Sequence, residues 1–312
     1  MTASANVVSA PPRPGMRKVW MRAVRLFSFT ASITPVLIGS AFALVDHAFR
    51  PGVAVLVLLA CVLCHAGCNL ANDYFDFRKG TDREMLLGRG GVIQDGWLTP
   101  NQVRVGMAVA FGLATALGLI VLGLSTWWLM LLAIPCLVAA VAYTGGPKPL
   151  GYMALGEVTV WLAMGMGITC GTYVALTREL TWEVVVGSLG ISALVAAILH
   201  VNNLRDFESD RAAGKTTLAH LLGWAKAVRE LDLLLIGAYL FALATVAMDL
   251  ANWPVLIVFV TVPAARAIST RVETDPTPPS LNGAVRLTAQ LHFRYGLLFA
   301  AGLVIRAFIE RI

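Results

Sequence analysis

Charged residues are scarce in this chain. Lys, Arg, Asp and Glu make up 13% of the 312 residues, and 58% of the positions are hydrophobic. Soluble globular domains carry about 25% charged residues, and disordered chains are polar. The composition therefore excludes both classes and predicts an integral membrane protein, with a mean hydropathy of +0.75.

Other features are missing as well. The five cysteines all lie in apolar runs, which gives no support to a disulfide framework. Residues 53–64 are apolar without the alternation of an outer-membrane β-barrel strand. The net charge of +6 is spread over separate loop clusters, so the sequence offers no single basic face for a nucleic acid.

Long apolar segments recur along most of the chain. A helix of about 20 residues crosses a hydrocarbon core of roughly 30 Å. We predict an all-α polytopic membrane protein, a bundle of about nine transmembrane helices. The expected spans are 23–45, 52–72, 103–123, 126–143, 153–176, 184–202, 230–249, 252–270 and 287–308. Residues 1–22 are expected to form a cytoplasmic arm and residues 23–312 a single transmembrane domain.

Basic residues indicate how the chain is oriented. If the N-terminus is cytoplasmic, most of the 24 Lys and Arg residues fall on the cytoplasmic side. Arg50, Arg178, Arg306 and Arg311 fall on the opposite side. The positive-inside rule favours this orientation. We expect a multi-pass protein of the cell inner membrane whose N-terminus and active-site loops are cytoplasmic.

Two acidic windows end two of the spans. Both windows combine amides and carboxylates at helical spacing: Asn69, Asn72, Asp73 and Asp76 at the end of span two, and Asn202, Asn203, Asp206 and Asp210 at the end of span six. Each set is expected to lie on one face of one helix. Carboxylates at a membrane helix end cost several kcal/mol to desolvate unless a positive charge lies among them.

A divalent cation would satisfy both windows. Oxygen-only ligands suit Mg²⁺, which is often completed by substrate phosphates. Nearby basic residues would bind the remaining phosphate oxygens: Lys148, Arg205 and Lys215, with Arg78 and Lys79. The sequence therefore predicts a diphosphate held between metal and cations. Asp82 is a further candidate ligand.

The same segments resemble those of a known enzyme family. The runs from Asn69 to Asp82 and from Asn202 to Lys215 resemble the two aspartate-rich motifs of UbiA-type intramembrane prenyltransferases. The segments 142–150, 155–157 and 287–292 also resemble the 1,4-dihydroxy-2-naphthoate branch of menaquinone synthesis. Lys-Thr-Thr-Leu at 215–218 departs from that branch, where a further basic residue is expected.

The resemblance implies a function. It implies Mg²⁺-dependent transfer of a polyprenyl group from an isoprenoid diphosphate to an aromatic acceptor, most closely 1,4-dihydroxy-2-naphthoate, giving demethylmenaquinone, diphosphate and CO₂. The alternative acceptors are 4-hydroxybenzoate, homogentisate and chlorophyllide. A CDP-alcohol phosphotransferase and a membrane transporter are rival classes, although a transporter would hold its polar residues near the bilayer midplane.

Roles follow for individual residues. Asp73, Asp76, Asp206 and Asp210 are assigned to metal and catalysis, with Asp82 in second place. The diphosphate is assigned to Asn69, Asn72, Lys148, Asn202, Asn203, Arg205 and Lys215, and the acceptor to Tyr143 and Glu157. His65, His200 and His292 are read as hydrogen-bonded core residues, with His200 nearest to the second window.

Overall fold

A computed structural model describes residues 14–79, 91–146 and 148–310. These residues are mainly helical and contain no strand, apart from one isolated parallel bridge between Met153 and Thr216. The prediction of an all-α protein is therefore confirmed.

Long apolar helices dominate the described chain. Eight are long and apolar enough to cross a membrane: Leu26–Val45, Pro51–Arg78, Pro100–Leu124, Gly156–Thr177, Trp182–Arg205, Trp224–Met248, Leu250–Thr274 and Pro278–Ile309. The shorter apolar segment Trp127–Ala142 coincides with the remaining predicted span. The last helix begins at Pro278, nine residues before the predicted start at 287, because Pro278 and Pro279 are accommodated in its first turn.

The elements follow one another in this order: α1 (Met16–Ala23), η1 (Leu26–Phe29), α2 (Thr30–Val45), α3 (Pro51–Lys79), α4 (Pro100–Leu124), η2 (Trp127–Leu129), α5 (Met130–Ala142), η3 (Leu150–Tyr152), α6 (Gly156–Val160), the π-helical η4 (Trp161–Gly167), α7 (Ile168–Thr177), α8 (Trp182–Arg205), α9 (Phe207–Ala212), α10 (Leu218–Leu222), α11 (Trp224–Met248), η5 (Leu250–Thr261), α12 (Val262–Thr274) and α13 (Pro278–Ile309).

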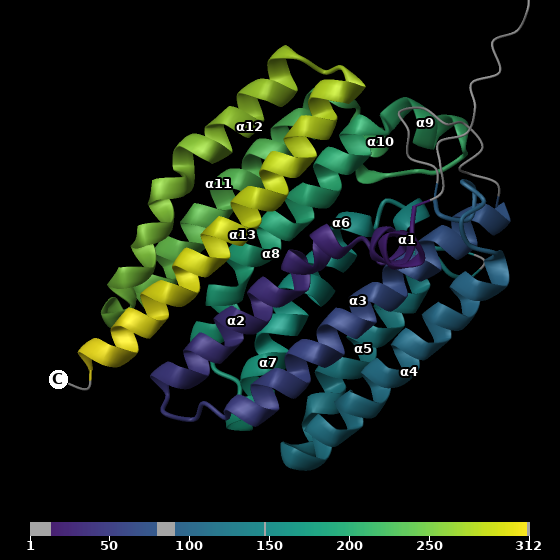
Figure 1. Cartoon of the computed structure of the whole chain (residues 1–312). Helices are drawn as coiled ribbons and strands as arrows, with labels where there is room; N and C mark the ends of the chain where they lie inside the picture. The colour runs from purple at the N-terminus through teal and green to yellow at the C-terminus, as the bar shows by residue number, and fades with distance from the viewer. Residues whose placement is uncertain (1–13, 80–90, 147, 311–312) are drawn as a thin grey trace, which may run out of the picture.

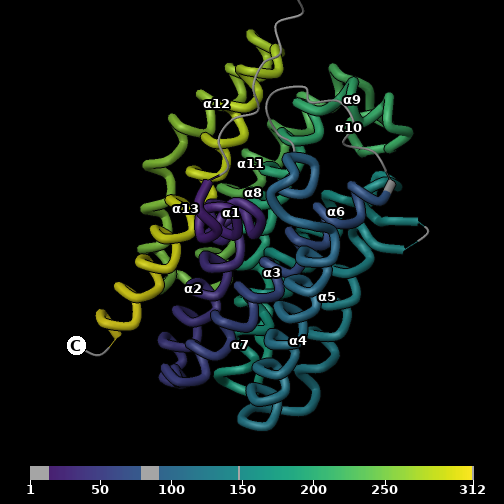
Figure 2. Tube along the Cα trace, turned by 45° about the vertical axis from the view of Figure 1, so that its right-hand side comes forward, coloured from purple at the N-terminus to yellow at the C-terminus, as the bar shows by residue number. Residues whose placement is uncertain are grey.

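The long helices lie side by side (Figure 1). α8 packs against both α11 and α13, α13 also packs against α2, and α2 packs against α7. α3 pairs with α4 at the edge of the bundle that carries α5 (Figure 2). The short helices α9 and α10 lie towards the upper right in both views, and α1 lies lower, near the start of α2. We call the end of the bundle where α3 and α8 finish the carboxylate end.

Small residues let these helices approach closely. A Cβ at Gly302 of α13 would lie 2.6 Å from the Val255 Cα of η5. A Cβ at Gly190 of α8 would lie 2.5 Å from the Tyr295 hydroxyl of α13. Close backbone approach of this kind supplies van der Waals packing where lipid removes the hydrophobic drive for association.

Large apolar side chains cover the outside. Leu119 of α4, Leu131 of α5, Leu233 of α11 and Val260 of η5 are 63%, 67%, 65% and 67% exposed, respectively. Side chains of this size are expected to face hydrocarbon when they line several membrane-length helices. The fold is therefore that of a multi-pass membrane protein.

An ionic network holds the opposite end of the bundle. Arg306 of α13 bonds Glu183 of α8 (2.8 Å), Asn252 of η5 (2.6 Å), Asp249 (2.6 Å) and Glu310 (2.9 Å). The Arg306 side chain is only 10% exposed. One guanidinium thus neutralises carboxylates from three parts of the chain and fixes α8, α13 and η5 to one another.

Removing this guanidinium should destabilise the fold. In Arg306→Met the carboxylates lose their shared cation, and the free energy of unfolding in detergent should fall by about 1–3 kcal/mol. Arg294→Met, which changes an exposed arginine on the same helix, is the matched control. Equal melting temperatures for the two variants would contradict a stabilising role for the network.

Candidate active site

The first acidic window lies within a continuous helix. α3 extends to Lys79, so Asn69, Asn72, Asp73 and Asp76 share its last turns, as their spacing predicts. Asn69 and Asp73 are 6% and 5% exposed. Asp82 lies outside the described residues.

The segment between α1 and η1 holds the buried part of this window. Asn69 donates its amide to the Val24 carbonyl (2.8 Å) and the Ser28 hydroxyl (3.2 Å). Asp73 accepts from the Arg25 guanidinium at 3.0 Å and from the Val92 amide at 3.4 Å. The buried carboxylate is therefore neutralised by a cation that lies 48 residues earlier in the chain.

Arg25 has an unusual backbone. Its φ of 52° and ψ of 54° place it in the left-handed region, just before η1. A non-glycine residue in that region costs of order 1 kcal/mol, and the ion pair with Asp73 offsets it. The sequence marked Arg25 only as one of several basic residues near the first span, and no spacing signal pairs it with Asp73.

The second acidic window is not one helical stripe, and that prediction is wrong. α8 ends at Arg205, Asp206 caps it, and Asp210 lies on the separate short helix α9. Arg205 donates to Asp206 through Nε (2.6 Å) and Nη2, and to the Asn202 side chain through Nη1 (2.7 Å). This bidentate pairing holds the chain where it leaves α8.

Lys215 completes the second window. Its ammonium lies 3.0 Å from Asp210, whose side chain is 16% exposed. The pKa of Asp210 lies above its ordinary value. Burial raises it most, the positive charge of Lys215 lowers it in part, and the negative charge of Asp206 raises it further. Lys148, also assigned to phosphate, is exposed beyond α5, and Asn72 is half-buried.

Tyr152 joins the two windows. Its hydroxyl donates to Asp76 at 2.7 Å, and the Lys215 ammonium lies 5.8 Å from its ring centroid. The loops are also paired through their backbones, because Thr216 N–H donates to Tyr152 (3.3 Å) and Ala154 N–H donates to Thr216 (2.8 Å). Nothing in the sequence singled out Tyr152, since it lies 76 residues from Asp76.

Tyr143 follows α5 directly and contacts the loop that carries Tyr152. Its carbonyl accepts from Gly151 N–H at 3.0 Å. Its hydroxyl lies 3.5 Å from where a Gly156 Cβ would stand. The structure thus brings the two residues assigned to the acceptor together, beside both acidic windows.

Glu157 is buried in the first turn of α6, 4% exposed. Its Oε1 lies 3.0 Å from His200 Nδ1 and accepts from the Asn203 amide at 2.9 Å. Asn203, predicted to bind the diphosphate, is therefore used to hold Glu157. His200 is a buried, hydrogen-bonded residue as expected, and so is His65, which bonds Ser28 and Ser32.

The carboxylates are paired with cations rather than with one another. Among the described residues, no three His, Cys, Asp or Glu side chains converge as they would around a metal ion. Asp73, Asp206 and Asp210 each contact Arg25, Arg205 or Lys215 instead. The donor set still fits a hard cation, because it consists of carboxylate and amide oxygens at one end of the bundle.

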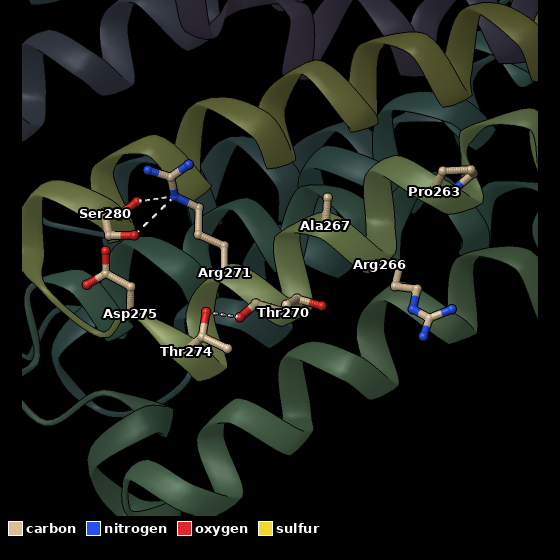
Figure 3. A pocket seen from close by; sticks show the side chains of 8 residues that line it. All are labelled: Pro263, Arg266, Ala267, Thr270, Arg271, Thr274, Asp275 and Ser280. Atoms are coloured by element: carbon tan, nitrogen blue, oxygen red, sulfur yellow. Dashed lines mark hydrogen bonds between the residues drawn. The ribbon is translucent and has the colours of Figure 1, made fainter.

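Two surface pockets lie outside this cluster. One of about 660 Å³ lies along α12, where Arg271 bonds the Ser280 carbonyl (3.0 Å) and hydroxyl (3.1 Å), and Arg266 lines the same pocket farther along α12 (Figure 3). The other, of about 600 Å³, follows apolar residues of α5 to Gly146 and Lys148. Neither pocket is lined by the carboxylates of the two windows.

Known proteins share both the sequence pattern and the fold. The pattern of the UbiA prenyltransferase family matches residues 32–304. A 1,4-dihydroxy-2-naphthoate octaprenyltransferase of Bacillus subtilis is 30% identical over 96% of each chain. A 2-carboxy-1,4-naphthoquinone phytyltransferase of a Synechocystis species is 27% identical, covering 93% of this chain and 94% of that protein.

A solved structure is similar in shape. The UbiA homologue of Archaeoglobus fulgidus, bound to GPP and Mg²⁺, superposes with a TM-score of 0.67 at 16% identity, over 91% of this chain and 99% of that one. This likeness concerns the fold and independently supports the helical arrangement described above.

The pairing of Arg25 with Asp73 can be tested by a double-mutant cycle. Because the Arg25 side chain is 42% exposed, the coupling should be modest, about 1 kcal/mol in the free energy of unfolding. Arg25→Met should destabilise the wild type more than it destabilises Asp73→Asn. The same cycle with Arg104→Met in place of Arg25→Met is the control. It should be additive, because Arg104 is an exposed residue of α4. Additivity in the Arg25 cycle would exclude the ion pair.

Proposed function

The chain belongs to the UbiA prenyltransferase family, and from this we propose that it transfers a polyprenyl group from an isoprenoid diphosphate to 1,4-dihydroxy-2-naphthoate. Diphosphate and CO₂ would be released, and the product would be the hydroquinone form of demethylmenaquinone, which air oxidises to the quinone. The observation that carries the proposal is the meeting of two cation-bearing carboxylate windows at one end of the bundle, joined by Tyr152.

Support for the acceptor comes from the relatives. The Bacillus and Synechocystis proteins are named for naphthalene-derived acceptors and for different prenyl groups. The simplest function that both share is prenylation of a naphthalene acceptor, with prenyl groups of different length. Family membership excludes the CDP-alcohol phosphotransferase and transporter classes, and the gathering of acidic residues at one end agrees with this.

We assign Mg²⁺ to Asp73, Asp76, Asp206 and Asp210, with Asp82 as a further ligand. The metal would neutralise charge on the diphosphate as it leaves. Asn69, Asn72 and Asn202 would orient the carboxylates or contact the diphosphate, whereas Asn203 holds Glu157.

The cations now paired with the carboxylates are suited to the phosphates. Arg25, Arg205 and Lys215 each contact a carboxylate of the proposed metal site. Metal binding there would release these side chains, and phosphate oxygens are their natural alternative partners. Lys148, exposed at the same end, would join them. Arg25 is added to the predicted set on this ground.

The apolar interior suits the chemistry that follows. Cleavage of an allylic C–O bond develops positive charge on carbon, which water would capture. The bundle surrounds the site with membrane-length apolar helices, and a long isoprenoid tail can lie between them without entering water. Tyr143 and Glu157 are assigned to the acceptor, which would lie beside the diphosphate.

We also propose the orientation. The carboxylate end would face the cytoplasm in a bacterial inner membrane, with residues 1–22 as a cytoplasmic arm and residues 23–312 as one transmembrane domain. The basic residues at this end support it.

The reaction can be tested on membranes that contain the protein. Incubation with Mg²⁺, a polyprenyl diphosphate and either 1,4-dihydroxy-2-naphthoate or 4-hydroxybenzoate should give demethylmenaquinone from the naphthoate alone, detected by mass spectrometry. EDTA should abolish the product, and Asp73→Asn or Asp206→Asn should lower the rate by about a hundredfold or more. Product from the benzoate alone would refute the naphthoate assignment.

Single cysteines can test the orientation. Glu179 and Ser209 are exposed at opposite ends of α8. A membrane-impermeant maleimide should label Glu179→Cys in intact cells and Ser209→Cys only after permeabilisation. The wild type, whose cysteines all lie within apolar helices, is the control. The reverse labelling pattern would invert the proposed orientation.

A further inference from the structure

One oxygen of the Glu157 carboxyl group is buried without a partner. Oε1 contacts both His200 and Asn203, whereas Oε2 makes no hydrogen bond within the described part of the chain. An unsatisfied carboxyl oxygen in a membrane interior costs at least 1–3 kcal/mol, so a missing donor is expected. The position marks a place for a ligand.

The hydrogen-bond pattern shows that Oε2 carries no proton. His200 Nε2 faces the Ala227 carbonyl at 2.7 Å, and since a carbonyl can only accept, this nitrogen bears a hydrogen. One further proton is shared between His200 Nδ1 and Glu157 Oε1. Whether it resides on nitrogen or oxygen, the pair is neutral overall and Oε2 remains an acceptor. Before the reaction, a second proton, on Oε2, would leave His200 as an uncompensated buried cation.

The surroundings place this oxygen beside the reaction. His200 and Asn203 bond Glu157 from α8, and Asn203 lies one turn before Asp206. The Tyr143 hydroxyl lies 3.5 Å from where a Cβ of the neighbouring Gly156 would stand, and the Tyr143 carbonyl accepts from Gly151 N–H (3.0 Å). The next residue, Tyr152, bonds Asp76 (2.7 Å), so a molecule that donates to Oε2 would lie close to the proposed diphosphate site.

We propose that Glu157 binds a hydroxyl of the aromatic acceptor through Oε2 and takes up its proton as the ring attacks, an inference that rests on the proposed function. The hydroxyl O–H bond breaks and a Glu157 O–H bond forms. At the same time the ring carbon bonds the allylic carbon, and the allylic C–O bond breaks with its electron pair leaving on the diphosphate. The bond from that ring carbon to its carboxylate then breaks and releases CO₂, its electron pair restores the aromatic ring, and Glu157 returns the proton to the ring oxygen. The product is a hydroquinone like the acceptor, so no oxidant or reductant is needed.

His200 is a positioning residue in this scheme. It does not touch the acceptor. It fixes Oε1 and supplies or shares the compensating proton, so that Oε2 is directed towards the acceptor as a hydrogen-bond acceptor. The Ala227 carbonyl in turn fixes the imidazole ring, as second partners commonly do for functional histidines.

Glu157→Gln tests the proposal with a change of one atom. The purified full chain is assayed with Mg²⁺, a polyprenyl diphosphate and 1,4-dihydroxy-2-naphthoate from pH 6 to pH 9. The variant should lose about a hundredfold in kcat/KM for the acceptor. The loss should shrink as pH rises, because the acceptor hydroxyl then ionises in water, while KM for the diphosphate stays unchanged. Glu179→Gln, exposed at the opposite end, is the matched control.

His200→Asn tests the positioning role. Without the imidazole, Glu157 loses the partner that supplies or shares its compensating proton, so the acidic limb of the pH profile should move to higher pH. A loss of activity with an unshifted profile in both variants would assign Glu157 and His200 to structure alone and overturn the proposal. Unchanged activity in Glu157→Gln would overturn it as well.

A binding measurement distinguishes a failure of this proposal from a failure of the proposed function. Fluorescence titration with the naphthoate should show at least about tenfold weaker binding to Glu157→Gln than to the wild type, as expected when a charged hydrogen-bond partner is lost. A wild type that binds the naphthoate in this way without prenylating it would refute the function and retain the site. Equal binding by both proteins would refute the role of Glu157.

Discussion

Carboxylates buried at the end of membrane helices must be neutralised, and the rest of this end of the molecule follows from that constraint. Asp73 is almost fully buried and Asp210 largely so, and each contacts a basic side chain. The partners come from the segment before η1 and from the loop after α9. Neutralisation therefore brings together the segment before η1, helix α3 and the connection that follows α8. Together these three segments form the candidate site.

The neutralising cations also suggest how the site is prepared for its ligand. In the proposed function, a diphosphate with its metal would carry both kinds of charge that the carboxylates and cations of this end carry, in a different arrangement. The carboxylates would exchange Arg25 and Lys215 for the metal, and the freed cations would pair with phosphate. The protein then keeps its charges compensated in both states. Tyr152 holds the two windows at a fixed spacing, since it bonds Asp76 and lies against Lys215.

The two ends of the bundle use charge differently. At the end opposite the carboxylates, the Arg306 guanidinium bonds three carboxylates and an amide oxygen. At the carboxylate end the pairs are separate, and Glu157 retains an unbonded oxygen. The Arg306 network fits a structural role, whereas the unbonded oxygen fits binding.

The sequence by itself determined that the chain lies in a membrane, that it folds as helices, and where both acidic windows lie along it. Apolar segments of membrane length can satisfy their backbone only as helices, and a helical spacing of carboxylates is visible without a structure. The nine predicted spans correspond to the eight long helices and to Trp127–Ala142. The continuous stripe of the first window follows from the same rule, whereas the second window is interrupted at Asp206, where α8 ends and α9 begins.

Only the tertiary structure decided the partners. Arg25, Tyr152 and His200 lie 48, 76 and 43 residues from the side chains that they contact, and no local periodicity encodes a contact at such a separation. Asn203 illustrates the limit, since its spacing indicated a phosphate ligand and its packing assigns it to Glu157. Helical spacing fixes which face a side chain shares with its neighbours, but the packing of α3, α6 and α8 fixes what that face meets.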